Sequence, residues 1–154
     1  SGDGNKVMTI FAAVMYLNNG GTDFSNAAHN FPMMIKRKND KKVVEKLVAQ
    51  GRPLGYELLA NRGNETAYGY VQKQIKLESG DILFIFSDGL IEAINSSGEE
   101  FSERRLKNAL QKYSDSEATT IKDNIIHDFR EFISNKKPDD DVTFLICKYD
   151  KDAA

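Results

Sequence analysis

The sequence predicts an α+β domain in which helices pack on a mainly antiparallel sheet. Three observations carry this prediction. Short apolar or alternating runs, separated by turn residues, fill the chain up to about residue 86. Two segments with helical periodicity follow, at residues 102–113 and 118–135. A last apolar run, at residues 142–149, is predicted to return to the sheet as a strand.

Length and composition fit one globular domain. The chain has 154 residues, 40% of them hydrophobic and 29% charged. Its formal net charge of -2 gives no attraction to nucleic acid or to an anionic membrane. Cys147 is the single cysteine and no apolar run is long enough to span a bilayer, so a cytoplasmic location is expected. A membrane anchor upstream of residue 1 stays an open alternative.

The early segments are predicted to be strands. Residues 8–17 are apolar at nearly every position, which is typical of a central strand covered on both faces. Asn-Asn-Gly-Gly at 18–21 is a turn signal, after which 22–28 can return as the antiparallel partner. Residues 33–38 and 43–48 form a second predicted hairpin. Its basic tip is interpreted as solvated, with attraction of a phosphorylated partner as the alternative.

Two further strands are predicted before the helices. Residues 71–77 alternate apolar and polar side chains, as a half-exposed strand does. Residues 82–86 are all large and apolar, which indicates a strand buried on both faces. Gly89 would let the chain turn after this strand, so Asp88 is expected at its carboxyl end. Taken alone, the Asp-Gly pair is better explained as a turn dipeptide.

The helices are predicted from capping residues and periodicity. Ser102 is expected to cap the first helix, with Phe101 packing on Leu106. The second helix should begin near Ala118, and His127 falls off its apolar side. That apolar side consists of Ile121, Ile125, Phe129, Phe132 and Ile133.

Acidic side chains adjoin two of the predicted core strands. Asp88 follows the strand at 82–86, and an Asp triplet at 139–141 precedes the strand at 142–149. Carboxylates at the tips of two core strands could share one cation. Oxygen ligands of this kind suit Mg²⁺ and Mn²⁺.

Four motifs occur in a recognisable order: AAHNFP at 27–32, GRPLGY at 51–56, FSDGLIEAINSSGEEFSERRL at 86–106 and DDVTFLI at 140–146. Together they resemble the later motifs of metal-dependent type 2C protein serine/threonine phosphatases, in particular the bacterial SpoIIE-like, RsbU-type branch. The resemblance extends from about Val7 to Lys148. It implies a β-sandwich flanked by helices in α-β-β-α layers, with a two-metal site between the sheets.

The resemblance also implies site residues. By motif match, Asp88 and Asp140 are metal ligands, and Asp141 takes the neighbouring position, where it would support the ligands or hold a metal-bound water. His29 is a candidate general acid by its loop position, and Ala28 stands where the family has glycine. The implied reaction is attack of a water, activated by Mn²⁺ or Mg²⁺, on phosphoserine or phosphothreonine. The implied substrate is a phosphorylated regulator of the anti-anti-sigma type.

One family motif has no match. The family has an early Asp-x-x-Gly-x-Gly segment whose Asp bridges both ions, and Asp3-Gly4 lacks the strand that precedes it. The chain, residues 1–154, is therefore expected to be the later part of such a domain, with one core at about 7–149. Two dications about 4 Å apart repel by roughly 16 kcal/mol at an effective dielectric of about 20. With two carboxylates to offset that repulsion, this chain alone is expected to hold one ion or none.

Two consequences follow from the missing motif. A weak or inactive module that binds a signalling partner is the alternative to an active phosphatase. Strands removed from a packed sheet leave an unpaired edge and exposed apolar area, which favour pairing with another chain. Self-association through an exposed sheet edge is therefore expected.

Overall fold

A computed structural model describes residues 7–39, 41–55, 69–134 and 136–151. The strands and helices in these residues follow one another as β1 (Ile10–Met15), β2 (Gly21–Ala27), β3 (Met33–Lys38), β4 (Lys41–Lys46), β5 (Lys73–Lys76), β6 (Ile82–Phe86), α2 (Asp88–Ile91), α3 (Ser102–Tyr113), α4 (Ala118–Phe132) and β7 (Phe144–Lys148). Asp3-Gly4 and the second part of the predicted loop at 51–63 lie outside the described residues.

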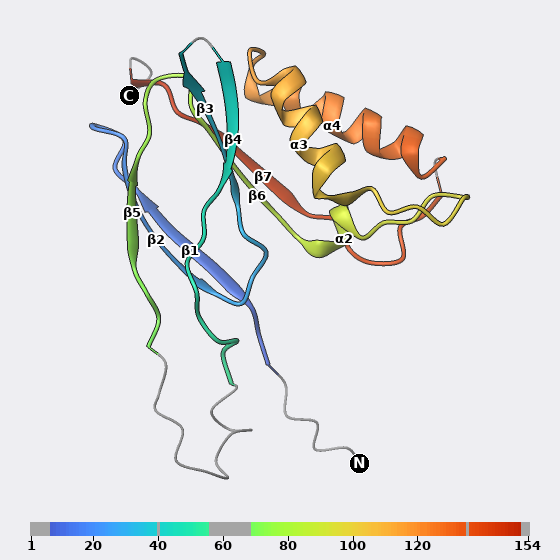
Figure 1. The fold of residues 1–154 in the computed structure, drawn as a ribbon, viewed down its shortest axis with the longest axis horizontal. Helices are drawn as coiled ribbons and strands as arrows, with labels where there is room; N and C mark the ends of the chain where they lie inside the picture. The colour runs from blue at the N-terminus through green and yellow to red at the C-terminus, as the bar shows by residue number, and fades with distance from the viewer. Residues whose placement is uncertain (1–6, 40, 56–68, 135, 152–154) are drawn as a thin grey trace.

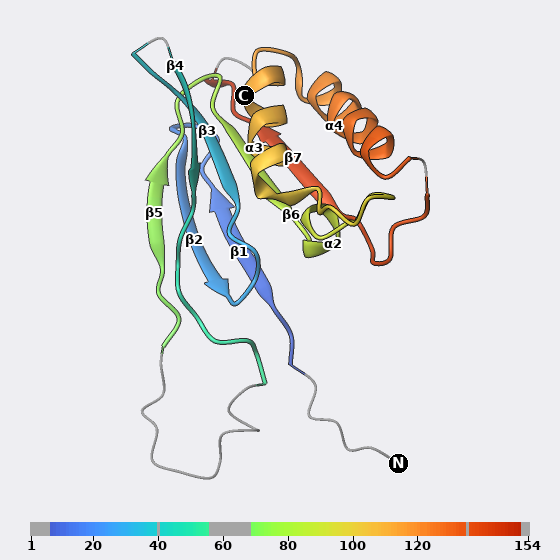
Figure 2. The same ribbon diagram turned by 45° about the vertical axis from the view of Figure 1, so that its right-hand side comes forward.

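The strands form two antiparallel sheets stacked on each other. One has three strands in the order β1-β2-β5, and the other has four in the order β4-β3-β6-β7. Helices α3 and α4 cover the outer face of the four-stranded sheet (Figures 1 and 2). The fold is thus the predicted α+β sandwich. Among the described residues no helix covers the outer face of the three-stranded sheet.

Alternation along β3 and β6 places side chains in two separate cores. Met33, Ile35 and Phe84 point to the helices and join one cluster with α3 and α4. Met34 and Leu83 point the other way and pack with Phe24 of β2 between the sheets. Because both faces of β6 are covered, its five residues must all be apolar, as the sequence predicted.

The strand predicted to be central, at residues 8–17, lies at the edge of the described sheet. Among the described residues β1 pairs with β2 alone and is largely exposed, so residues 8–17 do not form the central strand covered on both faces that the sequence predicted. Of the described strands, β7 likewise pairs only with β6, and Leu145 is 55% exposed. An apolar run without charges indicates a strand, but it does not say whether both neighbouring positions in the sheet are filled.

The helix predictions are confirmed except at one cap. Helix α4 buries the predicted side that includes Ile121, Ile125 and Phe129, while His127 is exposed. Ser102 is not an N-cap: it lies within α3 with a positive φ of 67° and makes no capping hydrogen bond. Phe101 takes the N-cap position instead, and its buried ring packs edge-on against Phe129.

Asp81 is a buried carboxyl group at the start of β6. Its Oδ2 accepts the backbone N–H of Glu78 at 2.9 Å. Burial raises the pKa of Asp81, although the Glu78 hydrogen bond and the charge of Lys36 oppose this. The folded state therefore binds the Asp81 proton more tightly than the unfolded state does.

An Asp81→Asn variant is expected to gain stability relative to the native chain as pH rises through the titration range of Asp81. The raised pKa favours folding while Asp81 is protonated, and this contribution is lost once the buried group ionises. Urea unfolding of both proteins from acid to neutral pH measures the difference. If the native chain instead gained stability relative to the variant as pH rises, the raised pKa of Asp81 would be contradicted.

Candidate metal centre

Strand register brings the four sequence motifs to one end of the sandwich. Met33, the first residue of β3, lies opposite Phe84, and Phe144, the first of β7, lies opposite Phe86. The segments before β3 and β7 therefore lie where β6 ends and α2 begins, as both ribbon views show for the β2–β3 connection (Figures 1 and 2). Met33 also lies opposite Lys46, so the segment after β4 reaches the same end.

Asp88-Gly89 and Asp140-Asp141 are in direct backbone contact. A Cβ atom added to Gly89 would lie 2.5 Å from the carbonyl oxygen of Asp141 and 3.4 Å from the carbonyl carbon of Asp140. Gly89 is thus required for close approach. It does not make the sharp turn expected from the sequence, because it lies in the one-turn helix α2. Two motifs about fifty residues apart in the chain are neighbours in space.

Hydrogen bonds from Ser87 stabilise this contact. Its Oγ donates to the carbonyl oxygen of Asp141 at 3.0 Å and accepts the N–H of Thr143 at 2.9 Å. The N–H of Ser87 also donates to the Thr143 carbonyl at 2.9 Å. These bonds continue the β6–β7 pairing beyond Phe144 and fix where the chain leaves each strand.

The carboxylates at this contact are exposed and each engages an adjacent amide. Asp88 Oδ1 accepts the N–H of Gly89 at 3.1 Å, and Asp140 Oδ1 accepts the N–H of Asp141 at 2.7 Å. One oxygen of each group is left for another ligand. Within the described residues no three His, Cys, Asp or Glu side chains are grouped to hold a metal ion. Two hard carboxylates suit a single divalent ion that keeps several waters.

His29 lies at the same end of the sandwich, but its backbone is hydrogen-bonded to Asn26. The Asn26 side chain accepts the His29 N–H at 2.7 Å and donates to the His29 carbonyl at 2.9 Å. Asn26 is 1% exposed, so this loop is held by a buried amide. The geometry therefore brings the backbones of Asp88-Gly89 and Asp140-Asp141 together. Among the described residues, the His29 imidazole makes no hydrogen bond with these acidic residues.

Ala28 has a backbone conformation that favours glycine. Its φ is +56°, in the left-handed region, where a Cβ costs roughly 1–2 kcal/mol. Ala28→Gly is expected to stabilise the fold by up to about 1 kcal/mol, because part of the relief is offset by the greater freedom of glycine in the unfolded chain.

The adjacent Ala27 provides the matched control for this prediction. It is buried at the end of β2, where glycine should cost about 0.5–1 kcal/mol. Chemical denaturation of both variants should therefore give shifts of opposite sign. Equal destabilisation by the two substitutions would show that Ala28 is not strained.

Two packing residues of this site were missed by sequence reasoning. Gly51 approaches the β2 end so closely that an added Cβ would lie 2.1 Å from the Asn26 carbonyl oxygen. Asn26 itself had a detectable signal, since it falls on the same face of β2 as Thr22 and Phe24, and all three are buried. A polar side chain in that pattern indicates a specific hydrogen-bonding task.

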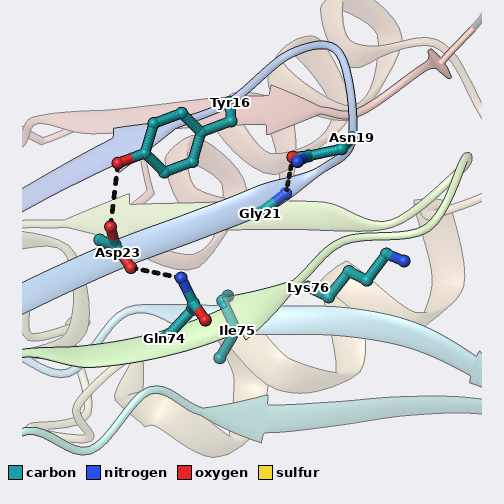
Figure 3. A pocket seen from close by; sticks show the side chains of 7 residues that line it. All are labelled: Tyr16, Asn19, Gly21, Asp23, Gln74, Ile75 and Lys76. Atoms are coloured by element: carbon teal, nitrogen blue, oxygen red, sulfur yellow. Dashed lines mark hydrogen bonds between the residues drawn. The ribbon is translucent and has the colours of Figure 1, made fainter.

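A hollow of about 600 Å³ lies on the three-stranded sheet, and neither Asp88 nor Asp140 lines it (Figure 3). Asp23 accepts hydrogen bonds there from the Tyr16 hydroxyl at 3.0 Å and from the Gln74 amide at 2.8 Å. Its lining residues are Tyr16, Asn19, Gly21, Asp23, Gln74, Ile75 and Lys76. The hollow shares none of these residues with the four motifs.

Comparison with known families identifies the chain. Residues 1–150 match the family model described as Stage II sporulation protein E (SpoIIE). The chain belongs to the SpoIIE family. Comparison with curated proteins gives no match. No helix within the described part of this SpoIIE-family chain is long and apolar enough to cross a membrane.

Solved phosphatase domains share the fold of this SpoIIE-family chain. The SiaA-PP2C domain of Pseudomonas aeruginosa is 18% identical with a TM-score of 0.67, and the match covers 86% of this chain and 48% of that one. The RsbU and RsbW domains of a Mycobacterium tuberculosis protein are 18% identical with a TM-score of 0.69, and the match covers 97% of this chain and 38% of that one. The Mn-presoaked phosphatase domain of SpoIIE from Bacillus subtilis is 16% identical with a TM-score of 0.60, and the match covers 92% of this chain and 56% of that one. The chain thus spans about half or less of each.

Proposed function

We propose that this chain is the later part of a metal-dependent protein serine/threonine phosphatase domain. The proposed substrate is phosphoserine or phosphothreonine on a regulatory protein of the anti-anti-sigma type. Membership of the SpoIIE family supports the reaction class. The observation that carries the proposal is the backbone contact between Asp88-Gly89 and Asp140-Asp141. The solved protein in which RsbU and RsbW domains occur together supports a regulatory partner.

In this proposal Asp88 and Asp140 hold Mn²⁺ or Mg²⁺, and Asp141 supports them from the adjacent position. A divalent ion bound there would lower the pKa of water and screen the phosphate oxygens. Hydrogen bonds of Ser87 to the backbone of Asp141 and Thr143 hold this segment beside the end of β6. Manganese was also soaked into crystals of one solved relative. His29 stays a candidate general acid, supported by its place at the same end of the sandwich.

A second candidate is a module that binds a signalling partner with little or no turnover. It is favoured by the carboxylate count, since the described residues do not group three potential metal ligands. A single ion leaves the phosphate charge less screened than two ions would. We therefore expect one tightly bound ion and weak turnover for residues 1–154 alone.

Hydrolysis of p-nitrophenyl phosphate with Mn²⁺ separates the two candidates. The phosphatase predicts slow, metal-dependent turnover that Asp88→Asn and Asp140→Asn each abolish. Asp139→Asn removes the same charge from the same loop and should leave the rate within a few-fold. Manganese binding without turnover would favour the binding module, and the absence of both would remove the metal centre altogether.

A further inference from the structure

A recess of about 260 Å³ lies at the end of the sandwich opposite the acidic motifs. It is lined by side chains of β3, β4 and β7, together with the turns that precede β6 and follow α3. Both ribbon views show the tip of the β3–β4 hairpin and the α3–α4 turn at the end remote from α2 (Figures 1 and 2). The recess lies where five segments meet rather than along a strand edge, and it shares none of its described lining residues with the four motifs.

The charged side chains that line this recess, which we call the basic recess, are mostly cationic. The described ones are four cations, Lys36, Arg37, Lys42 and Lys148, and two carboxylates, Asp81 and Asp115. With all six ionised, four positive charges against two negative ones leave a net charge of +2 in the lining. A concave surface with an excess of positive charge concentrates anions, and a doubly charged anion would balance this one.

Two lysines of the basic recess are fixed in position, unlike the exposed Lys38 at the hairpin tip. Lys36 and Lys148 are both half-buried. The Lys36 Nζ donates to the carbonyl oxygen of Lys76 at 3.0 Å, and the Lys148 Nζ donates to that of Ser116 at 2.7 Å. Because a carbonyl group has no net charge and an ammonium group has three N–H donors, each lysine keeps its positive charge and further donors for a ligand.

Arg37 and Lys42 already hold one oxyanion, the carboxylate of Asp115. The two cations lie directly opposite each other in the β3–β4 register, an arrangement of like charges that is destabilising by itself. Arg37 donates to Asp115 Oδ1 at 3.0 Å, and Lys42 pairs with Oδ2. The hydrogen bond from Lys42 lowers the pKa of Asp115. Since the Asp115 side chain is 68% exposed, these surface ion pairs are weak and an external anion can compete for the same donors.

We propose that the basic recess binds a phosphate group, either free inorganic phosphate or the phosphoryl group of a phosphorylated protein side chain. Such a group carries close to two negative charges at neutral pH and offers three strong acceptor oxygens, which matches the net charge of the lining. Lys36 and Lys148 would contact it with their remaining N–H donors. Arg37 would contribute the planar fork that suits phosphate oxygens. This site is independent of the proposed metal centre, because it uses neither Asp88 nor the residues beside it.

Isothermal titration of residues 1–154 with inorganic phosphate, at constant ionic strength and without added metal ion, tests the proposal. We expect saturable binding at one site. Lys148→Gln should raise the dissociation constant about tenfold or more, because it removes one charge-assisted hydrogen bond. Lys38→Gln is the matched control, since Lys38 pairs with Glu45 and does not line the recess. It should change the dissociation constant less than about twofold, because exposed charges are screened.

Asp115→Asn should have the opposite effect and tighten phosphate binding several-fold. The substitution removes the competing carboxylate and releases the donors of Arg37 and Lys42. General destabilisation of the fold would weaken binding, so a gain in affinity cannot come from that cause. Far-ultraviolet circular dichroism checks that both this variant and Lys148→Gln keep the native secondary structure.

Amide resonances locate the bound phosphate. Those of Gly80 and Asp115, which line the basic recess, should shift on titration, whereas that of Gly89 at the metal centre should not. Asp88→Asn should bind phosphate as the native chain does. Loss of manganese binding in Asp88→Asn with phosphate binding retained would keep the two sites separate, so that one can fail without the other.

A short phosphoserine peptide distinguishes the two sources of the phosphate group. Binding at least as tight as that of inorganic phosphate would identify a phosphorylated protein side chain, and weaker binding would identify free phosphate. The absence of saturable binding for both probes, equal losses in Lys148→Gln and Lys38→Gln, or unchanged affinity in Asp115→Asn would each overturn the proposal.

Discussion

Replacing Asp88 by asparagine is expected to weaken Mn²⁺ binding by more than about 100-fold, and Asp140→Asn should have a similar effect. Losing only a hydrogen-bond partner of a metal ligand typically costs about 10–100-fold in affinity, so losing a ligand should cost more. The fold should be unaffected because both carboxylates are exposed and bond only to adjacent amides. Isothermal titration of each variant with Mn²⁺ measures the loss.

The double variant Asp88→Asn/Asp140→Asn distinguishes a shared ion from two separate weak sites. If one ion needs both carboxylates, the double variant should bind little worse than either single variant, which is strong non-additivity. Two independent sites would give additive losses. Asp139→Asn is the control for charge, and an equal loss in that variant would mean that the loop attracts cations only by its overall charge.

Gly89→Ala is expected to destabilise the fold by roughly 1–3 kcal/mol and to abolish the metal site. The added Cβ would lie 2.5 Å from the Asp141 carbonyl oxygen. That atom belongs to the backbone, and Ser87 holds it in place, so it cannot rotate aside as a side chain could. Relief requires α2 and the Asp140-Asp141 segment to separate. Urea unfolding and Mn²⁺ titration of the same variant measure both effects.

Gly69→Ala is the matched control, because an added Cβ there meets no atom within 4 Å. It should change stability by no more than about 0.5 kcal/mol. If Gly89→Ala behaved like Gly69→Ala in both assays, the two acidic motifs would not be packed against each other.

The sequence predicted best those segments whose own residues show which of their faces are buried. The run 82–86 had to be buried on both faces, and β6 lies between the helices and the second sheet. The apolar side of α4 was equally readable, because a period of 3.6 residues places Ile121, Ile125 and Phe129 on one side.

The position of a strand within its sheet could not be read in the same way. Residues 8–17 have the composition of a central strand, yet β1 is an edge strand among those that the structure describes. Whether a second neighbour exists depends on other segments, not on the strand itself. The same limit applies to β7, whose Leu145 faces solvent.

The site was predictable in part. Asp88 and Asp140 could be singled out because each adjoins an apolar strand, and the register of β6 with β7 brings their motifs together. The close approach at Gly89 and the hydrogen bonds of Ser87 depend on how the strands end, which periodicity does not describe. The role of Asp88 and Asp140 as metal ligands stays a prediction.

The central claim is that carboxylate oxygens from Asp88 and Asp140 meet around one divalent ion. The most direct measurement is an anomalous-scattering map from crystals of residues 1–154 soaked in Mn²⁺. We predict a single strong peak bonded to one oxygen of each residue, at about the 2.1 Å that hard octahedral ions keep. A manganese peak bonded to only one of the two residues, or found only elsewhere on the protein, would contradict the claim.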